Sequence, residues 1–142
     1  MHEFVPFCAI IEGREPGSIV YEDEDSVGLM DIYPVYAGHT LVVPRTHYEN
    51  LVSCPEALAA HLFTVAAKLG PAIMEATGGT AFNVWTANGE DAGQRVFHLH
   101  LHVLPRFSDD KFGLRFPKDF PAVKDQEELE AMATRIRSAV QR

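Results

Sequence analysis

The chain has 142 residues, of which 46% are hydrophobic and 23% are charged, the balance of an ordinary folded protein. Twenty acidic residues against twelve basic ones give a net charge of −8, which argues against a partner such as nucleic acid that is bound through its phosphate backbone. The apolar runs fall short of the ~20 residues that cross a bilayer, and the N-terminus lacks the basic start of a secretory signal. With two cysteines and no disulfide framework, we expect a cytoplasmic protein with no membrane span.

The first half of the sequence begins with three predicted strands. Two short β-prone runs, residues 18–25 and 26–32, are split by acidic residues and predict an antiparallel hairpin. Residues 39–45 predict a third strand. No repeat or linker divides the sequence, so we expect one domain over residues 1–142.

Residues 53–70 predict a long helix. Ser53 and Glu56 have the spacing of a capping box, and leucines and a valine follow at helical spacing. Pro71 should kink or end this helix, and Gly78 should close the element.

The second half predicts two strands and a final helix. Residues 80–88 and 96–106 are the strands, residues 126–139 form an amphipathic helix, and residues 107–125 give no clear pattern. The fold class is therefore α+β, with a mainly antiparallel sheet and the long helix packed on it.

The run HLHLHVLPR at residues 98–106 places three histidines on alternate positions. In a strand, His98, His100 and His102 share one face at a spacing of about 6.6–6.8 Å, while Leu99 and its alternating apolar neighbours face the helix. Imidazoles on a sheet face need water, hydrogen-bond partners or a ligand.

Three explanations fit this pattern. The histidines can occupy a half-exposed polar face, hold a metal, or perform catalysis. One ion would hardly collect all three, because His98 and His102 start roughly 13 Å apart along the strand. For catalysis, a neutral imidazole with an ordinary pKa of about 6.5 is a free nucleophile near neutral pH, and two flanking rings can assist it.

Residues 98–104 resemble the His-x-His-x-His-x-x signature of the histidine-triad (HIT) nucleotide hydrolases and transferases. The similarity extends over about residues 4–106. It includes Pro105-Arg106 after the triad, Gly93-Gln94 and Asn88 before it, and an upstream block from Asp31-x-x-Pro34 through Gly38-His39 to His47.

The resemblance implies a HIT-like fold and roles for four histidines. His100 would be the nucleophile that takes the nucleotidyl group. His102 would contact the phosphate and help the leaving group, while His98 and His39 would orient the nucleophile by hydrogen bonds.

The resemblance also implies how a nucleotide would bind. Asp31 would accept hydrogen bonds from the ribose hydroxyls, and Asn88 and Gln94 would lie on the phosphate side. From local sequence alone, Asn88 and Gln94 could equally be turn residues, and Asp31 would more simply end a strand. Arg95 stands where many relatives carry Ser or Thr, and a cation there favours polyphosphate leaving groups over amines. The purine would lie against small apolar side chains, for which the candidates are Phe7, Ile10, Leu29 and Ile32.

One departure from the family concerns zinc. Many bacterial relatives begin with Cys-x-x-Cys, whose thiolates join two histidines in a structural zinc site. Here Val5 stands at the first cysteine position, so that a degenerate site of Cys8, His47 and His98 remains. We therefore expect no bound structural zinc and a hydrogen bond between His47 and His98.

The sequence thus predicts an enzyme that acts on the α-phosphate of purine nucleotides and requires no cofactor. The resemblance further implies a homodimer. A non-catalytic nucleotide-binding or interaction module and a metal-dependent hydrolase are the alternatives. Two other residues are predicted to lie outside the site: His61 on the helix surface and Trp85 in the core.

Overall fold

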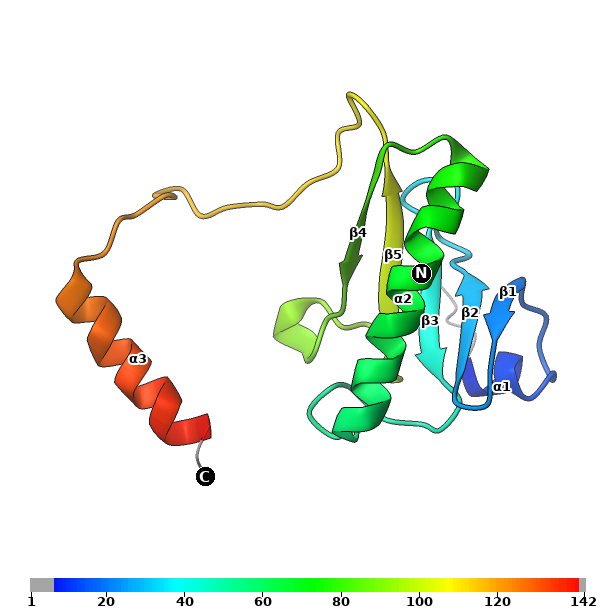
Figure 1. The fold of residues 1–142 in the computed structure, drawn as a ribbon, viewed down its shortest axis with the longest axis horizontal. Coiled ribbons are helices and arrows are strands. Elements are labelled where there is room, and N and C mark those ends of the chain that lie inside the picture. Colours follow the sequence, from blue (N-terminus) through cyan, green and yellow to red (C-terminus); the bar gives the residue numbers. More distant parts are fainter. Residues whose placement is uncertain (1–6, 141–142) are drawn as a thin grey trace. The chain divides into compact units, whose positions relative to one another are not determined.

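The computed structural model describes residues 7–140, which belong to two compact units (Figure 1). The first unit, Met1–Lys111, carries every candidate site residue named above, and the second is Phe112–Arg142. The C-terminal helix falls in the second unit, and residues 107–125 form neither helix nor strand. One domain over the whole chain stays a prediction.

A five-stranded antiparallel sheet forms the centre of the first unit. Its strand order is β1-β2-β3-β5-β4, so β3 and β5 lie inside the sheet and β4 lies at one edge. The predicted hairpin and all three further strands are confirmed. Their bounds are Ile19–Glu22 for β1, Ser26–Met30 for β2, Thr40–Pro44 for β3, Ala81–Trp85 for β4 and Leu101–Arg106 for β5.

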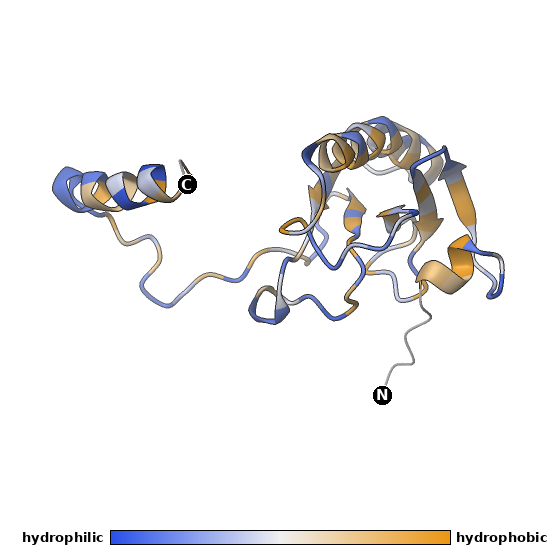
Figure 2. Cartoon of the chain, turned by 90° about the horizontal axis from the view of Figure 1, so that it is seen from below, coloured by the Kyte–Doolittle hydropathy of each residue, from blue (hydrophilic) through white to orange (hydrophobic). Residues whose placement is uncertain are grey.

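Helix α2 (Glu56–Thr77) covers one face of the sheet, as predicted (Figure 2). Leu99, Leu101 and Val103 face it, confirming that the apolar half of the histidine run points to the helix. In length and apolar composition, α2 is the one helix of the described chain that would suffice to cross a membrane. About a third of that stretch is buried in the structure.

The ends of α2 differ from the prediction. The helix starts after Pro55 with no side-chain cap, and the Ser53 hydroxyl donates to the Asn50 carbonyl instead, so the capping box is wrong. The helix also continues through Pro71. A proline in a helix removes one backbone hydrogen bond, and buried side chains on both sides of Pro71 hold the two halves to the sheet. Gly78 closes α2 in the left-handed conformation, as expected.

The opposite face of the sheet carries a second apolar cluster. Helix α1 (Phe7–Ile11) packs there through Phe7 and Ile10 against Leu29 and Leu41 (Figure 2). Because β3 is buried along its whole length, the sheet is covered on both faces. The candidate site lies on this second face.

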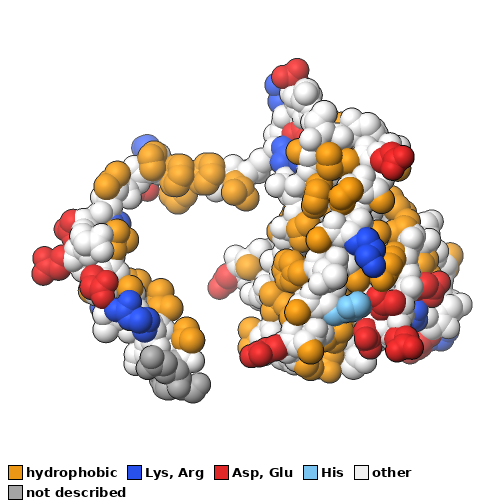
Figure 3. Space-filling view, viewed as in Figure 1, with side chains coloured by type: hydrophobic (Ala, Val, Ile, Leu, Met, Phe, Trp, Pro, Cys, Tyr) orange, Lys and Arg blue, Asp and Glu red, His pale blue; other side chains and the backbone are white. Residues whose placement is uncertain are grey.

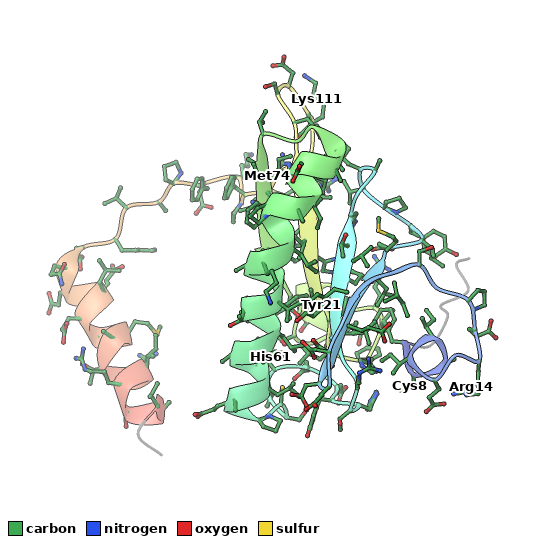
Figure 4. The ribbon with its side chains drawn as sticks, turned by 45° about the vertical axis from the view of Figure 1, so that its right-hand side comes forward. Cys8, Arg14, Tyr21, His61, Met74 and Lys111 are labelled. Carbon is green, nitrogen blue, oxygen red and sulfur yellow. The ribbon has the colours of Figure 1, made fainter. Side chains whose placement is uncertain are left out.

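A polar cluster ties the β1–β2 hairpin to α2. The carboxylate of Asp23 accepts hydrogen bonds from Tyr21 and from His61, which reaches across from the helix (Figure 4). Burial alone would raise the pKa of Asp23, but these bonds and those from Asp25 and Ser26 hold it well below its usual range. His61 is thus a partly buried residue with a structural partner.

The second unit holds α3 (Gln126–Val140), which confirms the predicted amphipathic helix. No residue of α3 is buried. The segment before it carries exposed apolar side chains that Figure 3 shows in orange, among them Leu114, Phe116, Phe120 and Val123.

Candidate active site

A pocket of about 540 Å³ opens on the sheet face that α1 covers. Cavities of this size are typical of small-molecule sites. Eight of the residues singled out from the sequence line it: Phe7, Ile10, Leu29, Asp31, Ile32, Arg95, His100 and His102. The lining also includes residues that the sequence analysis did not single out as site residues, namely Pro16, Gly17, Met30, Tyr33, Leu41, Trp85, Gly93 and Val96.

His100 stands at the pocket just before β5 begins. Its Nδ1–H donates to the backbone carbonyl of His98 at 2.8 Å, because a carbonyl oxygen can only accept. The other nitrogen, Nε2, therefore keeps its lone pair. Burial lowers the pKa of His100, so its imidazole is neutral near neutral pH.

Beside His100, His39 and His102 are joined by a hydrogen bond whose direction is fixed by the backbone. The Val35 amide donates to His39 Nδ1 at 3.1 Å, which places the His39 proton on Nε2. His39 Nε2–H then donates to His102 Nδ1 at 2.9 Å, which leaves the proton of His102 on Nε2. Burial lowers the pKa of His39, and burial with the neighbouring His100 and His39 lowers that of His102 to about 3. The pair therefore presents a neutral N–H donor.

This pair does not fit a metal ion. Asp31, His39 and His102 each bring one ligand atom within 4.8 Å of the others. A metal at His39 Nε2 would have to replace the proton that the Val35 bond places there.

The structure corrects the hydrogen bonds expected for His98 and His39. The imidazole of His98 turns away from His100, bonds the Pro44 carbonyl through Nε2 at 3.0 Å, and only its backbone carbonyl orients His100. His39 contacts His102 rather than the nucleophile. Both His98 and His100 lie against Phe7, so His98 shares the predicted face, but its ring nitrogens are taken up by the Pro44 carbonyl and by His47 and Cys8.

Asp31 follows β2 and lines the pocket. Its Oδ1 accepts from the Tyr33 amide at 2.8 Å, the pattern of a residue that starts a turn. Its Oδ2 lies 3.6 Å from His39 Nε2. The carboxylate therefore has acceptor capacity left for a ligand.

Asn88 and Gln94 lie outside the pocket lining, and their expected contact with phosphate stays a prediction. Asn88 Oδ1 accepts from the Leu51 amide at 2.8 Å. The amide of Gln94 accepts from Gly89 and donates to the Glu49 and Val96 carbonyls. Both side chains tie the loop between β4 and β5 to the loop between β3 and α2, because they bond backbone groups of Leu51 and Glu49.

Arg95 and Trp85 complete the pocket wall. Arg95 is exposed, and within the described chain it is the one basic side chain of the lining. The sequence analysis placed Trp85 in the core. The structure corrects this: Trp85 ends the edge strand β4 and lies against His102 in the pocket.

Cys8, His47 and His98 form a group whose spacing fits zinc. The Nδ1 atoms of His47 and His98 are 3.2 Å apart, and Cys8 Sγ lies 3.5 Å from His98 Nδ1. A tetrahedral zinc with bonds of ~2.0–2.3 Å keeps its ligand atoms about 3.3–3.6 Å apart. The expected contact between His47 and His98 is present. Val5, at the position of the fourth ligand in relatives, lies outside the described residues.

Metal analysis tests the prediction that zinc is not a resident cofactor. We expect the protein purified without added zinc to hold well under one zinc per chain, since a closed structural site has four ligands and this sequence supplies a cysteine at only one of the family's two positions. Cys8→Ala is the matched control for any zinc found. One zinc per chain that is lost in Cys8→Ala would contradict the prediction.

The family model described as "HIT domain" matches residues 12–109. An uncharacterized HIT-like protein of Saccharolobus solfataricus is 42% identical over 120 residues, which are 84% of each chain. A protein of Arabidopsis thaliana named adenylylsulfatase is 38% identical over 104 residues, 73% of this chain and 53% of its own. The chain therefore belongs to the HIT family.

Solved structures confirm the HIT-like fold. A HIT-family protein of Bacillus subtilis matches with a TM-score of 0.84 and 38% identity, over 93% of this chain and 94% of its own. A zinc-bound histidine triad protein of Mycobacterium smegmatis matches with a TM-score of 0.73 and 37% identity, over 94% and 95% of the two chains. The resemblance noted in the sequence is thereby confirmed.

Proposed function

We propose that this protein is a nucleotide hydrolase or nucleotidyl transferase that acts on the α-phosphate of purine nucleotides. The observation that carries the proposal is the hydrogen bond from His100 Nδ1 to the His98 carbonyl, because it leaves an unprotonated Nε2 at the pocket. Burial lowers the pKa of His100 and keeps the ring neutral, although the hydrogen bond to His98 and the charge of Asp31 act in the opposite direction. A group prepared in this way is a nucleophile.

In the first step, the lone pair of His100 Nε2 attacks the α-phosphorus. An N–P bond forms, and the P–O or P–N bond on the far side breaks, with its electron pair going to the leaving group. The Nε2–H of His102 donates a hydrogen bond to the phosphate or to the departing atom. The Nδ1–H of His100 stays on the His98 carbonyl and supports the positive charge of the nucleotidyl-imidazolium.

In the second step, water attacks the same phosphorus. An O–P bond forms, the N–P bond breaks, the electron pair returns to His100 Nε2, and the proton of water passes to solvent. In a transferase, another acceptor takes the place of water. No step of this scheme requires a metal or cofactor.

The pocket supplies the contacts for a nucleoside. Phe7, Ile10 and Leu29 offer an apolar surface for a base, and the carboxylate of Asp31 offers an acceptor for the ribose hydroxyls. A volume of about 540 Å³ suits one nucleotide.

The test of the proposal is the mass of the protein after brief mixing with a nucleotide substrate. We expect one added nucleotidyl group per chain, carried on His100. The candidate substrates are a dinucleoside polyphosphate, a nucleoside phosphoramidate and adenylyl sulfate. Tight binding of a nucleotide without any adduct or turnover would support the non-catalytic module instead.

We further propose that Arg95 selects anionic leaving groups. With His39, His100 and His102 all neutral, no imidazolium is at hand to protonate an amine as it leaves. A polyphosphate or sulfate departs as an anion, and Arg95 supplies the positive charge that this anion meets in the pocket. The name adenylylsulfatase of the Arabidopsis relative accords with such a substrate.

Arg95→Ser should lower kcat/KM for a dinucleoside polyphosphate about three- to tenfold, the size of a solvent-screened charged hydrogen bond. The value for a nucleoside phosphoramidate should change little. Arg95→Lys is the control that keeps the charge. An unchanged ratio of the two substrates in Arg95→Ser would refute the role.

The homodimer and the cytoplasmic location expected from the sequence remain predictions.

A further inference from the structure

Trp85 is the only tryptophan in the chain, and its ring lies flat against His102. The ring centroids are 4.6 Å apart and the ring planes differ by 9°. The pairing of β4 with β5 places Trp85 directly opposite His102, so the two side chains are cross-strand neighbours on one face. The stack is therefore a consequence of the sheet register.

The other contacts of His102 leave the plane of its ring undetermined. His39 holds one atom, Nδ1, and the ring can still tilt about that bond. His100 touches it edge-on, at 5.0 Å between centroids and 66° between planes. The parallel face of Trp85 is the one contact among these that defines a plane.

We propose that Trp85 is a positioning residue for His102, and that its stacked ring sets the imidazole plane so that the N–H opposite His39 points at the leaving group. This proposal rests on the proposed function, because a leaving group exists only if the site performs nucleotidyl transfer. Trp85 acts through His102 rather than on the reacting atoms.

The stack also excludes water from His102. The groups that face this imidazole are His39 just before β3, His100 just before β5 and Asp31 just after β2, while Arg95 lies on the same pocket wall. Burial is the largest cause that lowers the pKa of His102, and an aromatic face contributes to that burial. Loss of the aromatic face should therefore raise this pKa toward its ordinary value.

Two substitutions separate the flat ring from its bulk. Trp85→Leu keeps an apolar side chain but no planar face, whereas Trp85→Phe keeps a planar face. We expect Trp85→Leu to lower kcat for a dinucleoside polyphosphate about three- to tenfold with little change in KM, the size of an aromatic pair. Trp85→Phe should recover most of that loss.

The ring signals of His102, followed by NMR against pH, give a readout that does not need turnover. They are assigned with His102→Gln, and we expect the midpoint of the His102 titration to move upward in Trp85→Leu and to stay near the wild-type value in Trp85→Phe. Thermal unfolding of both variants shows that each is folded at the temperature of the measurement.

Two outcomes would overturn the proposal. One is a Trp85→Leu protein with the wild-type kcat and the wild-type His102 titration. The other is an equal loss of kcat in Trp85→Leu and Trp85→Phe, since the planar face would then not be the cause. Failure of the proposed function is seen separately, as the absence of a nucleotidyl adduct on the wild-type protein.

Discussion

Replacement of His100 by alanine should abolish nucleotidyl transfer, with a loss in kcat of at least about a thousandfold, because the variant has no nucleophile at the pocket. The fold should survive. His100 makes one hydrogen bond, to the His98 carbonyl, and the loss of such a bond costs about 1 kcal/mol. The measurements are the turnover of a dinucleoside polyphosphate and the mass of the protein after brief mixing with it.

His61→Ala is the matched control for this experiment. It also removes an imidazole, but His61 lies on α2, on the other face of the sheet, and bonds Asp23. Its loss should lower the free energy of unfolding slightly and leave the transfer rate as in the wild type. A His100→Ala protein that retains a tenth of the wild-type turnover, or that still gains a nucleotidyl group, would refute the assigned role.

The alternation of the histidine run was predictable because it is a local property of an extended chain. Leu99, Leu101 and Val103 had to face a core, and they pack against α2. The hydrogen-bond partner of each imidazole nitrogen was not predictable in the same way. The His39–His102 bond joins β3 to β5, and it depends on strand pairing that neither run encodes alone.

Dependence on strand pairing also explains why the position of Trp85 could not be predicted. Its place opposite His102 follows from the register of β4 on β5, and a shift by one residue would have turned the indole to the helix side. The sequence of the strand is compatible with both. An aromatic residue in a predicted strand is most simply assigned to the core, and here the simple assignment was wrong.

The loop before the triad shows what the sequence could not reveal about Gln94. Its side-chain amide bonds Gly89 of its own loop and Glu49 of the loop between β3 and α2. These backbone bonds hold its orientation, and the partners come together only once both loops are folded.

Asp31→Asn is the second substitution for which we expect a large effect. The variant keeps an oxygen that accepts from the Tyr33 amide, so the turn after β2 should persist, but it loses the charge offered to the ribose. A hydrogen bond to a charged group is worth about 1.5–3 kcal/mol, which predicts a fall in kcat/KM of about ten- to a hundredfold. Most of the fall should appear in KM.

A substrate that lacks both ribose hydroxyls allows a thermodynamic cycle, in which the wild-type protein and Asp31→Asn are each measured on the substrate with and without the hydroxyls. The wild-type protein should discriminate against this substrate by the same ten- to hundredfold factor, about 1.5–3 kcal/mol, and Asp31→Asn should discriminate much less, because the group that reads the hydroxyls has already lost its charge. Each substrate is compared with its hydroxylated parent at equal pH and salt. If both proteins discriminate equally, Asp31 serves only the turn that its Oδ1 closes, and the ribose is held elsewhere.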